Sequence, residues 1–435
     1  MFKPRRAAFF SKMEKNSLAV IPAGREKIRN NDCEFPFRQS SDFHYLTGFN
    51  EPGACLVLLK DDESCKAILF NRKKDKSAEV WHGYRLGQSA AVSELGFDSA
   101  FAIEQFEHHL YELMDGLTTL IYPTFQDAEL DKSLSAVVNK LRGSARKGAV
   151  APTLIIDSSR ILHEMRLIKS ESEIELLSQA AEISASGHIR AMQSCRSGMW
   201  EYQLQAELEH EFALQGAPAT AYNSIVAGGE SACILHYTEN NRKLRDGNLV
   251  LIDAGAEYQG YAGDITRTFP VNGVFSEPQE KLYQLVLDVQ RSAISQVKPG
   301  AALIDINKNA VQQLVDGLIE LGLMQGDSEV LIKDEVYKNF YMHGIGHYIG
   351  LDVHDVGDYG TLENPRLLEV GMVVTIEPGL YVGSDADVDE QWRKIGIRIE
   401  DDVLVTEHGA EVLSADVPKS ITEIEALMAD AKQHG

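Results

Sequence analysis

The chain has 435 residues, of which 44% are hydrophobic and 25% are charged. Because a single hydrophobic core rarely grows beyond about 250–300 residues, this length predicts two domains. The 65 acidic and 42 basic residues give a net charge of −23, and no run of lysines and arginines is long enough to follow a phosphate backbone, which argues against nucleic acid as a partner.

The first residues do not form a recognisable targeting segment. The apolar stretch at 7–10 ends at Ser11 and Lys12, so it is too short for the core of a signal peptide. No later apolar run approaches the length of a membrane span. We therefore expect a soluble cytoplasmic protein with no membrane partner. The cysteines agree with a reducing compartment because they are scattered and form no Cys-x-x-Cys pair: Cys33, Cys55, Cys65, Cys195 and Cys233.

The first part of the chain has the pattern of a mixed α/β domain. Short apolar runs at 54–59 and 67–70 alternate with a helix-like stretch at 101–113. The apolar period then breaks down between 143 and 170, where glycine and proline are frequent. We place the domain junction there, which gives an N-terminal domain over 1–169 and a second domain over 170–435.

The second domain is expected to begin with a long amphipathic helix. Ser170 and Glu173 form a capping box, and apolar residues recur after it at helical spacing. A further helix is predicted over 279–295. Three β-rich segments, each bounded by glycine, proline or acidic turn residues, lie at 249–252, 373–376 and 395–405.

Five residues able to bind a hard divalent cation lie on or beside these strands, in apolar or glycine-rich surroundings where an unpaired charge is costly. One imidazole and four carboxylates suit manganese, cobalt or magnesium better than a structural zinc site, and shared carboxylates can hold two cations close together. The sequence therefore predicts a two-metal hydrolytic site made of Asp253, Asp264, His347, Glu377 and Glu400.

Asp253 and Asp264 are predicted to lie on a hairpin. Asp253 ends the buried strand at 249–252, and a second strand after the turn at 258–260 carries Asp264. In an antiparallel pair closed by an even-numbered loop, their odd separation places both carboxylates on one face. For either residue alone, a turn aspartate or a solvated strand aspartate is the alternative.

His343 and His347 have the spacing of helical zinc proteases, yet two glycines between them disfavour a helix and no glutamate follows His343. The glycines suggest tight backbone near a ligand. His354 follows seven residues after His347, so one of these histidines can bind metal while the others contact substrate.

Glu377 ends an apolar strand where a Pro-Gly pair reverses the chain, so its charge requires a partner. In the segment at 395–400 the period of two places Arg398 and Glu400 on one face, where Arg398 can steady carboxylates or substrate. The alternative for this segment is a structural Arg–Glu pair on an exposed sheet face.

The stretch His343-Gly-Ile-Gly-His-Tyr-Ile-Gly-Leu-Asp-Val-His-Asp355 resembles the proline-peptidase signature throughout its length. The segments around the other four candidate ligands resemble the remaining ligand motifs of that family. The closest likeness is to the Xaa-Pro aminopeptidases. It covers the C-terminal domain, and the N-terminal domain is more loosely similar to creatinase N-terminal domains. The resemblance implies a pita-bread C-terminal domain with metals in its cleft.

By the same resemblance, Asp264 and Glu400 would bridge two manganese ions, Asp253 would hold one of them, and His347 with Glu377 would complete the other. Cobalt, magnesium and zinc remain possible. His236 resembles a substrate histidine of the family and Tyr381 a residue near the scissile bond. Trp81 and Arg146 resemble positions that reach toward substrate, Trp81 from a neighbouring subunit, and the family favours a homodimer or homotetramer.

The expected activity is removal of the N-terminal residue from peptides with proline in second position. A metal-bridging hydroxide would attack, Glu377 would relay the proton to the leaving nitrogen, and His354 with His236 would stabilise the oxyanion. His343, Tyr381 and Arg398 would shape the proline side.

Four other functions are alternatives for this chain. Prolidase shares all five ligands and splits Xaa-Pro dipeptides. Methionine aminopeptidase has a similar metal set, but its single-domain form lacks an N-terminal domain of this size. Creatinase shares the fold without the metals. A catalytically silent protein that binds peptides or partners is the reading from another class, because fold alone never fixes activity.

Overall fold

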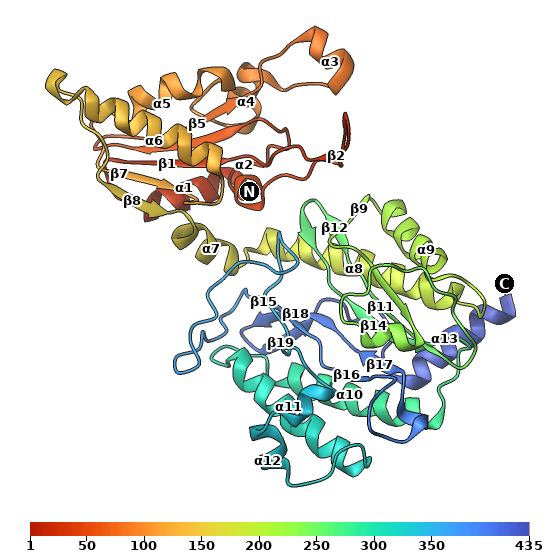
Figure 1. The fold of residues 1–435 in the computed structure, drawn as a ribbon. Coiled ribbons are helices and arrows are strands. Elements are labelled where there is room, and N and C mark those ends of the chain that lie inside the picture. The colour runs from red at the N-terminus through yellow and green to blue at the C-terminus, as the bar shows by residue number, and fades with distance from the viewer. Residues whose placement is uncertain (435) are drawn as a thin grey trace. The chain divides into compact units, whose positions relative to one another are not determined.

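The computed structural model describes the backbone of residues 1–434 and the side chains of residues 1–432. The chain divides into two compact units, Met1–Met165 and a second unit that begins at Arg166. Both units mix helices with strands (Figure 1). Over the described residues, every helix is too short or too polar to cross a membrane.

The first unit is built on a six-stranded sheet with the order β6-β5-β4-β1-β7-β8. The pairs β1–β4 and β4–β5 are antiparallel, whereas β1–β7, β5–β6 and β7–β8 are parallel. A mixed sheet of this kind is buried on both faces near its centre. Five of the six residues of β4 are buried, and Lys60 is the exception. The strands are β1 (Ser17–Pro22), β4 (Cys55–Lys60), β5 (Cys65–Asn71), β6 (Ser99–Ala102), β7 (Thr119–Tyr122) and β8 (Leu154–Asp157).

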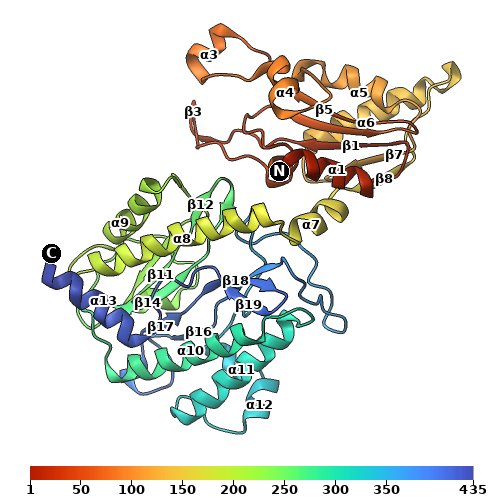
Figure 2. The ribbon, with the colours of Figure 1, turned by 180° about the vertical axis from the view of Figure 1, so that it is seen from behind.

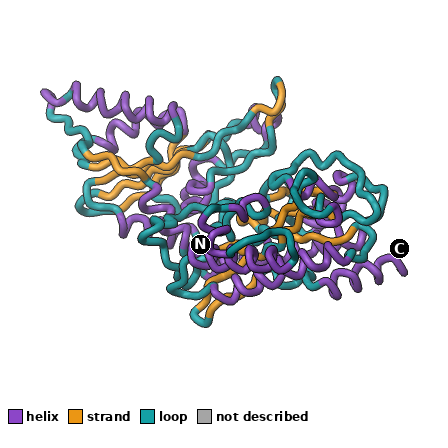
Figure 3. Tube along the Cα trace, turned by 60° about the horizontal axis from the view of Figure 1, so that its bottom comes forward, coloured by secondary structure: helices purple, strands orange, loops and turns teal. Residues whose placement is uncertain are grey.

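Helices cover both faces of this sheet (Figure 3). On one face, α6 (Ala128–Gly143) begins at Asp127, whose side chain accepts hydrogen bonds from two backbone amides, and it buries leucines and a valine at helical spacing. Helix α5 (Phe106–Met114) packs beside it over the same core. The remaining elements of this unit are α1 (Phe2–Lys12), α2 (Ser41–Thr47), α3 (Lys76–His82), α4 (Gly87–Leu95), the short pair β2 (Ile28–Asn30) and β3 (Cys33–Glu34), and α7 (Ser159–Leu167).

The expected strands at 54–59 and 67–70 are confirmed as β4 and β5. The helix predicted from residue 101 begins later, at Phe106, because Phe101 pairs with Phe70 in the sheet. The segment at 143–170, where the apolar period breaks down, contains the edge strand β8 and helix α7. A short edge strand with exposed residues carries too little pattern to be recognised.

The second unit opens with α8 (Glu171–Ser194), and the predicted capping box at its start is present, with the Glu173 carboxylate accepting from the Ser170 amide. Helix α10 (Glu277–Gln296) confirms the helix expected over 279–295. These helices lie outside the strands (Figure 2). The other helices of this unit are α9 (Glu201–Leu214), α11 (Leu303–Glu320), α12 (Ser328–Lys333) and α13 (Ile421–His434).

The strands of the second unit form several small antiparallel sheets around one hydrophobic core. Their orders are β10-β11-β14, β13-β12-β9, β15-β18-β19 and β16-β17. The strands are β9 (Ala219–Thr220), β10 (Ile225–Gly228), β11 (Leu249–Asp253), β12 (Ala256–Tyr258), β13 (Tyr261–Ala262), β14 (Thr266–Pro270), β15 (Val373–Ile376), β16 (Gly379–Val382), β17 (Ile395–Arg398), β18 (Asp401–Thr406) and β19 (Gly409–Val412).

The prediction of one continuous β-segment over 395–405 is wrong, because the structure has two strands there, β17 and β18. The segment is interrupted at Ile399 and Glu400, so that β17 pairs with β16 whereas β18 pairs with β15 and β19. The Glu400 amide donates instead to the Thr266 carbonyl at 3.1 Å. This interruption joins two sheets and places the Glu400 side chain at their junction.

Candidate metal centre

Each predicted ligand lies at the end of a strand or in a connection between strands. Such positions allow side chains from separate sheets to converge on one point. Asp253 is the last residue of β11, Asp264 lies between β13 and β14, Glu377 directly follows β15, Glu400 lies between β17 and β18, and His347 belongs to the irregular segment before β15.

The predicted hairpin is confirmed with one correction. Strands β11 and β14 pair antiparallel, and Asp253 lies opposite Thr266. Asp264 precedes β14 instead of lying within it, and β12 and β13 form their own small sheet in between. Since Asp264 is two residues before Thr266, its side chain still lies on the same face as that residue, and both carboxylates reach the same site.

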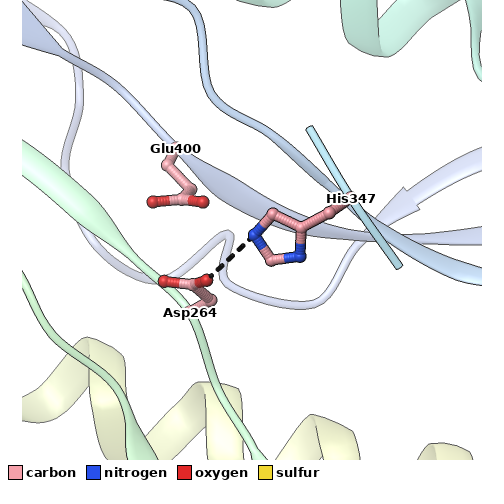
Figure 4. Close-up of side chains that lie close together, drawn as sticks. All are labelled: Asp264, His347 and Glu400. Carbon is pink, nitrogen blue, oxygen red and sulfur yellow. Dashed lines mark ion pairs between the residues drawn. The ribbon is translucent and has the colours of Figure 1, made fainter. Parts of the chain in front are cut away.

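Asp264, His347 and Glu400 form the tightest part of the site. One possible ligand atom from each lies within 4.8 Å of the others, and the three side chains converge from separate segments (Figure 4). The His347 Nε2 atom is 3.4 Å from an Asp264 oxygen and 3.7 Å from a Glu377 oxygen. Glu377 therefore extends the cluster on the imidazole side.

Asp253 extends the cluster on the other side. Its two oxygens accept from the Tyr222 hydroxyl and from Arg398, each at 2.6 Å. The Tyr222 oxygen is also 2.5 Å from an Asp264 oxygen, so this hydroxyl lies between the two carboxylates. Sequence reasoning missed Tyr222, because it follows the two-residue strand β9 in an irregular stretch where no periodic pattern singles it out.

The carboxylates repel one another in this buried space. Burial and the neighbouring acids raise the pKa of Glu377 to about 7, and burial with Asp264 as the nearest acid raises the pKa of Glu400 well above its ordinary value. Burial also raises the pKa of Asp264. Burial alone would lower the pKa of His347, but its hydrogen bond and charge contact with Asp264 raise it to about 9.

These shifts have one physical cause, which is a local excess of negative charge in a low dielectric. Arg398 and the His347 imidazole, whose pKa is raised, offset only part of the charge of four carboxylates, and divalent cations would offset the rest. Oxygen donors from four carboxylates and one imidazole are the donor set that divalent first-row cations accept. The residues therefore fit a pair of divalent cations.

Hydrogen bonds around the ligands hold them in place. Thr266 donates to Glu400 at 2.6 Å, and Asp402 accepts from the Asp264 amide at 3.0 Å. The Nδ1 atom of His347 lies 3.0 Å from the Tyr348 carbonyl. When Nδ1 carries the hydrogen, Nε2 is left for a cation, which is the usual arrangement for a ligating histidine.

The segment from His343 to His347 is not helical, as predicted. The tight backbone expected at its glycines is present at Gly346, where a Cβ would lie 1.9 Å from the Thr375 carbonyl oxygen of β15. That the glycines also lie near a ligand stays a prediction. A Cβ on Gly344 would meet nothing within 4 Å.

Arg398 links the cluster to the other predicted site residues. It donates to Asp253 at 2.6 Å and to the Tyr381 hydroxyl at 3.0 Å, and Tyr381 lies 2.8 Å from the His343 Nε2 atom. Arg398 and Glu400 are buried, with 4% and 2% of their surfaces exposed. The alternative of a structural pair on an exposed sheet face is therefore excluded.

His236 and His354 are exposed side chains that face the same cavity as the ligands. The His354 ring packs edge-on against the His347 ring, with centroids 4.3 Å apart. The cavity has a volume of about 440 Å³, and its lining is Tyr222, Asn223, Ile225, Leu235, His236, Thr238, Asp253, Asp264, His343, His347, Val353, His354, Glu377, Arg398 and Glu400.

Trp81 and Arg146 belong to the first unit, whereas every predicted metal ligand belongs to the second. Trp81 is on α3 and is 82% exposed. Arg146 is exposed in a single 3-10 turn after α6. That both residues reach toward substrate, Trp81 from a neighbouring subunit, stays a prediction.

Two regions of the chain match known protein families. Residues 175–407 match the metallopeptidase family M24, and residues 2–122 match the N-terminal domain of aminopeptidase P. The chain belongs to the M24 metallopeptidase family. The family match covers every predicted ligand of the metal centre, and it confirms the family expected from the signature at 343–355.

Three Xaa-Pro aminopeptidases are similar to this chain over most of their own length, from 98% for the Escherichia coli enzyme to 81% for the human one. Xaa-Pro aminopeptidase of Escherichia coli K12 is 49% identical over 99% of this chain and 98% of its own length. The Haemophilus influenzae enzyme of the same name is 48% identical over 98% of this chain and 96% of its own length. Human Xaa-Pro aminopeptidase 3 is 36% identical over 95% of this chain.

Solved structures of the M24 family superimpose closely on this chain. A zinc-substituted E. coli aminopeptidase P in complex with product and the same protein with the inhibitor Pro-Leu each give a TM-score of 0.97 at 49% identity, covering 99% of this chain and 98% of theirs. The predicted architecture, an N-terminal α/β domain followed by a pita-bread metallopeptidase domain, is thereby confirmed.

Proposed function

We propose that the chain is a metallo-exopeptidase that removes the N-terminal residue from peptides with proline in second position. The observation that carries this function is the convergence of Asp264, His347 and Glu400 in a cavity of about 440 Å³ that Asp253 and Glu377 also line. The chain is 49% identical to an Xaa-Pro aminopeptidase over 99% of its length. Retention of every predicted ligand argues against a creatinase-like chain without metals and against a silent binding protein.

The metal centre would hold two divalent cations, and manganese is our first choice. Asp264 and Glu400 would be shared between them, Asp253 would belong to one, and His347 with Glu377 to the other. Hard oxygen donors with a single imidazole support manganese over a thiolate-preferring metal. A relative has been solved in a zinc-substituted form, so zinc is the metal to compare first.

When bound, the cations supply a strongly activated water at neutral pH. The substrate requires this because the bond before proline lacks an N–H that a peptidase could grip. Glu377 lies at the edge of the cluster, 3.7 Å from the His347 imidazole. We assign it the transfer of a proton from water to the leaving proline nitrogen.

The histidines that line the cavity have separate tasks in this proposal. His354 and His236 face the cavity and donate hydrogen bonds to the developing oxyanion. His343, Tyr381 and Arg398 form one hydrogen-bonded chain and shape the side of the site that receives the proline ring. Arg398 also holds Asp253 in position.

A second copy of the chain is the macromolecular partner we propose, in a homodimer or homotetramer. Helix α3 and the loop after it expose Val80, Trp81 and Tyr84 by 80%, 82% and 94%. Exposed apolar groups of this size mark association surfaces. Light scattering of the parent and of Trp81→Ser tests this, because a parent monomer would contradict the assembly.

The compartment we propose is the reducing cytoplasm. All five cysteines are free thiols, and the two buried ones, Cys55 and Cys195, have pKa values raised by burial, which makes them unreactive. A protein with stable free thiols fits a compartment that keeps cysteines reduced.

The proposed activity is tested with three peptides on purified, manganese-loaded protein. An Xaa-Pro-Xaa tripeptide, the Xaa-Pro dipeptide and the matched Xaa-Ala-Xaa tripeptide are compared by release of the first residue, with and without a chelator. We expect rapid, chelator-sensitive hydrolysis of the first peptide only. Preferred turnover of the dipeptide would make the chain a prolidase, and chelator-resistant or absent turnover would contradict the proposal.

A further inference from the structure

We propose that Asp355, clamped between Arg166 and Lys169, is a positioning residue that sets the place of His354 in the cavity. This inference rests on the proposed function of His354 at the developing oxyanion. None of the three charged residues lines the cavity that holds the candidate metal ligands.

The three side chains form a charge cluster that is almost fully buried. One oxygen of Asp355 accepts from Arg166 at 2.6 Å and the other from Lys169 at 3.0 Å. The side chains of Asp355 and Lys169 are each 1% exposed, and that of Arg166 is 3% exposed. Each carboxylate oxygen of Asp355 is thus held by a different positively charged side chain.

Arg166 and Lys169 lie more than 180 residues before Asp355 in the chain. They belong to the end of α7 and the short connection to α8. The backbone of Lys169 is fixed as well, since its amide donates to the Gly371 carbonyl at 2.8 Å, just before β15. Asp355 is therefore held by a rigid part of the second unit.

His354 itself has no comparable anchor. Among the described residues its ring makes no hydrogen bond, and its ring contact is the edge-on packing against His347. A histidine that is exposed in the cavity and held by neither hydrogen bond nor ion pair takes its position from the backbone. The backbone at this point is determined by the residue that follows, Asp355.

Backbone hydrogen bonds close the loop from His347 to Asp355 and join it to two neighbouring strands. The Asp355 amide donates to the Tyr348 carbonyl at 2.8 Å, which closes the loop. Ile349 donates to the Val373 carbonyl in β15, and Gly350 accepts from the Ala262 amide in β13. One end of the loop carries the ligand His347 and the other end carries His354.

Gly350 shows how tightly the clamp is packed into this loop. A Cβ at this position would lie 2.2 Å from an Asp355 oxygen and 3.1 Å from the Lys169 side chain. The Asp355 carboxylate therefore lies directly against the loop backbone at Gly350. Because misplacement of a reacting group by about 1 Å can cost up to about 100-fold in rate, the clamp affects catalysis through geometry.

The test uses Asp355→Asn, which keeps the size of the side chain and removes its charge. With manganese stoichiometry and circular dichroism unchanged, we expect kcat on an Xaa-Pro-Xaa peptide to fall by about 10- to 100-fold and KM to change by less than about threefold. In a His354→Ala background, the same substitution should lower kcat by less than about threefold further.

Asp352→Asn is the matched control. Asp352 contacts the same Arg166 at 2.7 Å, but its side chain is 38% exposed, so we expect kcat within about twofold of the parent. If Asp355→Asn fails to fold, Lys169→Gln replaces it, since Arg166 then still pairs with Asp355. It should give a smaller loss of kcat that also disappears in the His354→Ala background.

Three results would overturn the inference. An unchanged kcat in Asp355→Asn or Lys169→Gln would show that the clamp does not affect catalysis, and an equal loss with and without His354 would show that it acts elsewhere. If His354→Ala alone leaves kcat unchanged, the function proposed for His354 fails, and the inference fails with it. The three results are distinguishable because the His354→Ala variant is measured separately.

Discussion

Glu400 and Asp401 are neighbours in the chain, and both are buried, yet their surroundings are opposite. Asp401 accepts from four donors, namely Arg267 and Ser414 at one oxygen and Gln290 and Lys419 at the other. Burial alone would raise its pKa, but Arg267 and Lys419 lower it to about 2.

Glu400 points to the other side and meets acids. Its carboxylate accepts from Thr266, and burial together with Asp264 and Glu377 raises its pKa well above the ordinary value. A buried carboxylate whose donors are all supplied by the chain stabilises the fold. A buried carboxylate whose neighbours are other carboxylates requires bound metal cations. This difference separates Asp401, which has a structural role, from Glu400, which has a functional one.

The largest effect is expected at the edge of the acid cluster. Glu377→Gln should lower kcat on an Xaa-Pro-Xaa peptide by about 10²- to 10⁴-fold, because the amide cannot carry a proton between water and the leaving nitrogen. Steady-state kinetics at saturating manganese measures this, with the exposed Glu363→Gln as control. Parent-like turnover with metal bound would show that Glu377 relays no proton.

The contrast between Asp401 and Glu400 is tested by replacing each carboxylate with an amide and measuring stability in chelator-treated protein. Asp401→Asn leaves the buried Arg267 and the half-buried Lys419 without their charge partner, so the free energy of unfolding should fall by about 3–5 kcal/mol. Glu400→Gln should change it by less than about 1 kcal/mol, because the raised pKa means that the amide replaces a protonated acid of the same shape. Urea titration that gave equal losses would contradict the distinction.

His188 sharpens the comparison, because it is buried on α8 and forms no ion pair with any described residue. Its Nε2 atom is 2.9 Å from the Ala254 carbonyl, and burial lowers its pKa to about 4. The unfolded chain binds a proton below about pH 6.5 and the folded chain only below about pH 4, so stability falls as pH drops through this interval.

The contribution of His188 to this loss is up to about 3 kcal/mol. His188→Gln has no such proton to bind, so the difference in unfolding free energy between parent and variant should depend on pH between 4 and 6.5. Urea titrations at several pH values measure this difference. A constant difference would mean that His188 is protonated in the folded chain.

The smallest effects concern the two glycines beside His347. Gly346→Ala should lower the unfolding free energy by about 1–3 kcal/mol, because its Cβ would overlap the Thr375 carbonyl. Gly344→Ala should change it by less than about 0.5 kcal/mol, because its Cβ would meet nothing. Thermal unfolding distinguishes the two, and equal effects would contradict the packing argument.

Features determined by neighbouring residues, such as the start of a helix or the end of a strand, were mostly predicted from the sequence. The capping box at Ser170 and the buried run before Asp253 each determine an element and its end, and the ligands follow from those ends. The interruption at Glu400 was not predictable, because apolar residues occupy every second position from Ile395 to Val405 except Asp401, and the break depends on a hydrogen bond with Thr266.

Residues that act across long separations were also missed. Tyr222 lies between two carboxylates supplied by other strands, and Arg166 meets Asp355 from 189 residues away. No periodicity or short motif carries such contacts, since they exist only after the sheets have assembled. The charge balance around Asp401 depends in the same way on Arg267 and Lys419, which come from distant segments.

The claim that the acid cluster requires cations is tested most directly by titrating manganese into chelator-stripped protein in a calorimeter. We predict two cations per chain, with release of protons from the carboxyl groups whose pKa values are raised. Glu400→Gln should lose at least one of the two. The account is contradicted if the parent binds no stoichiometric manganese, or if Glu400→Gln binds it as the parent does.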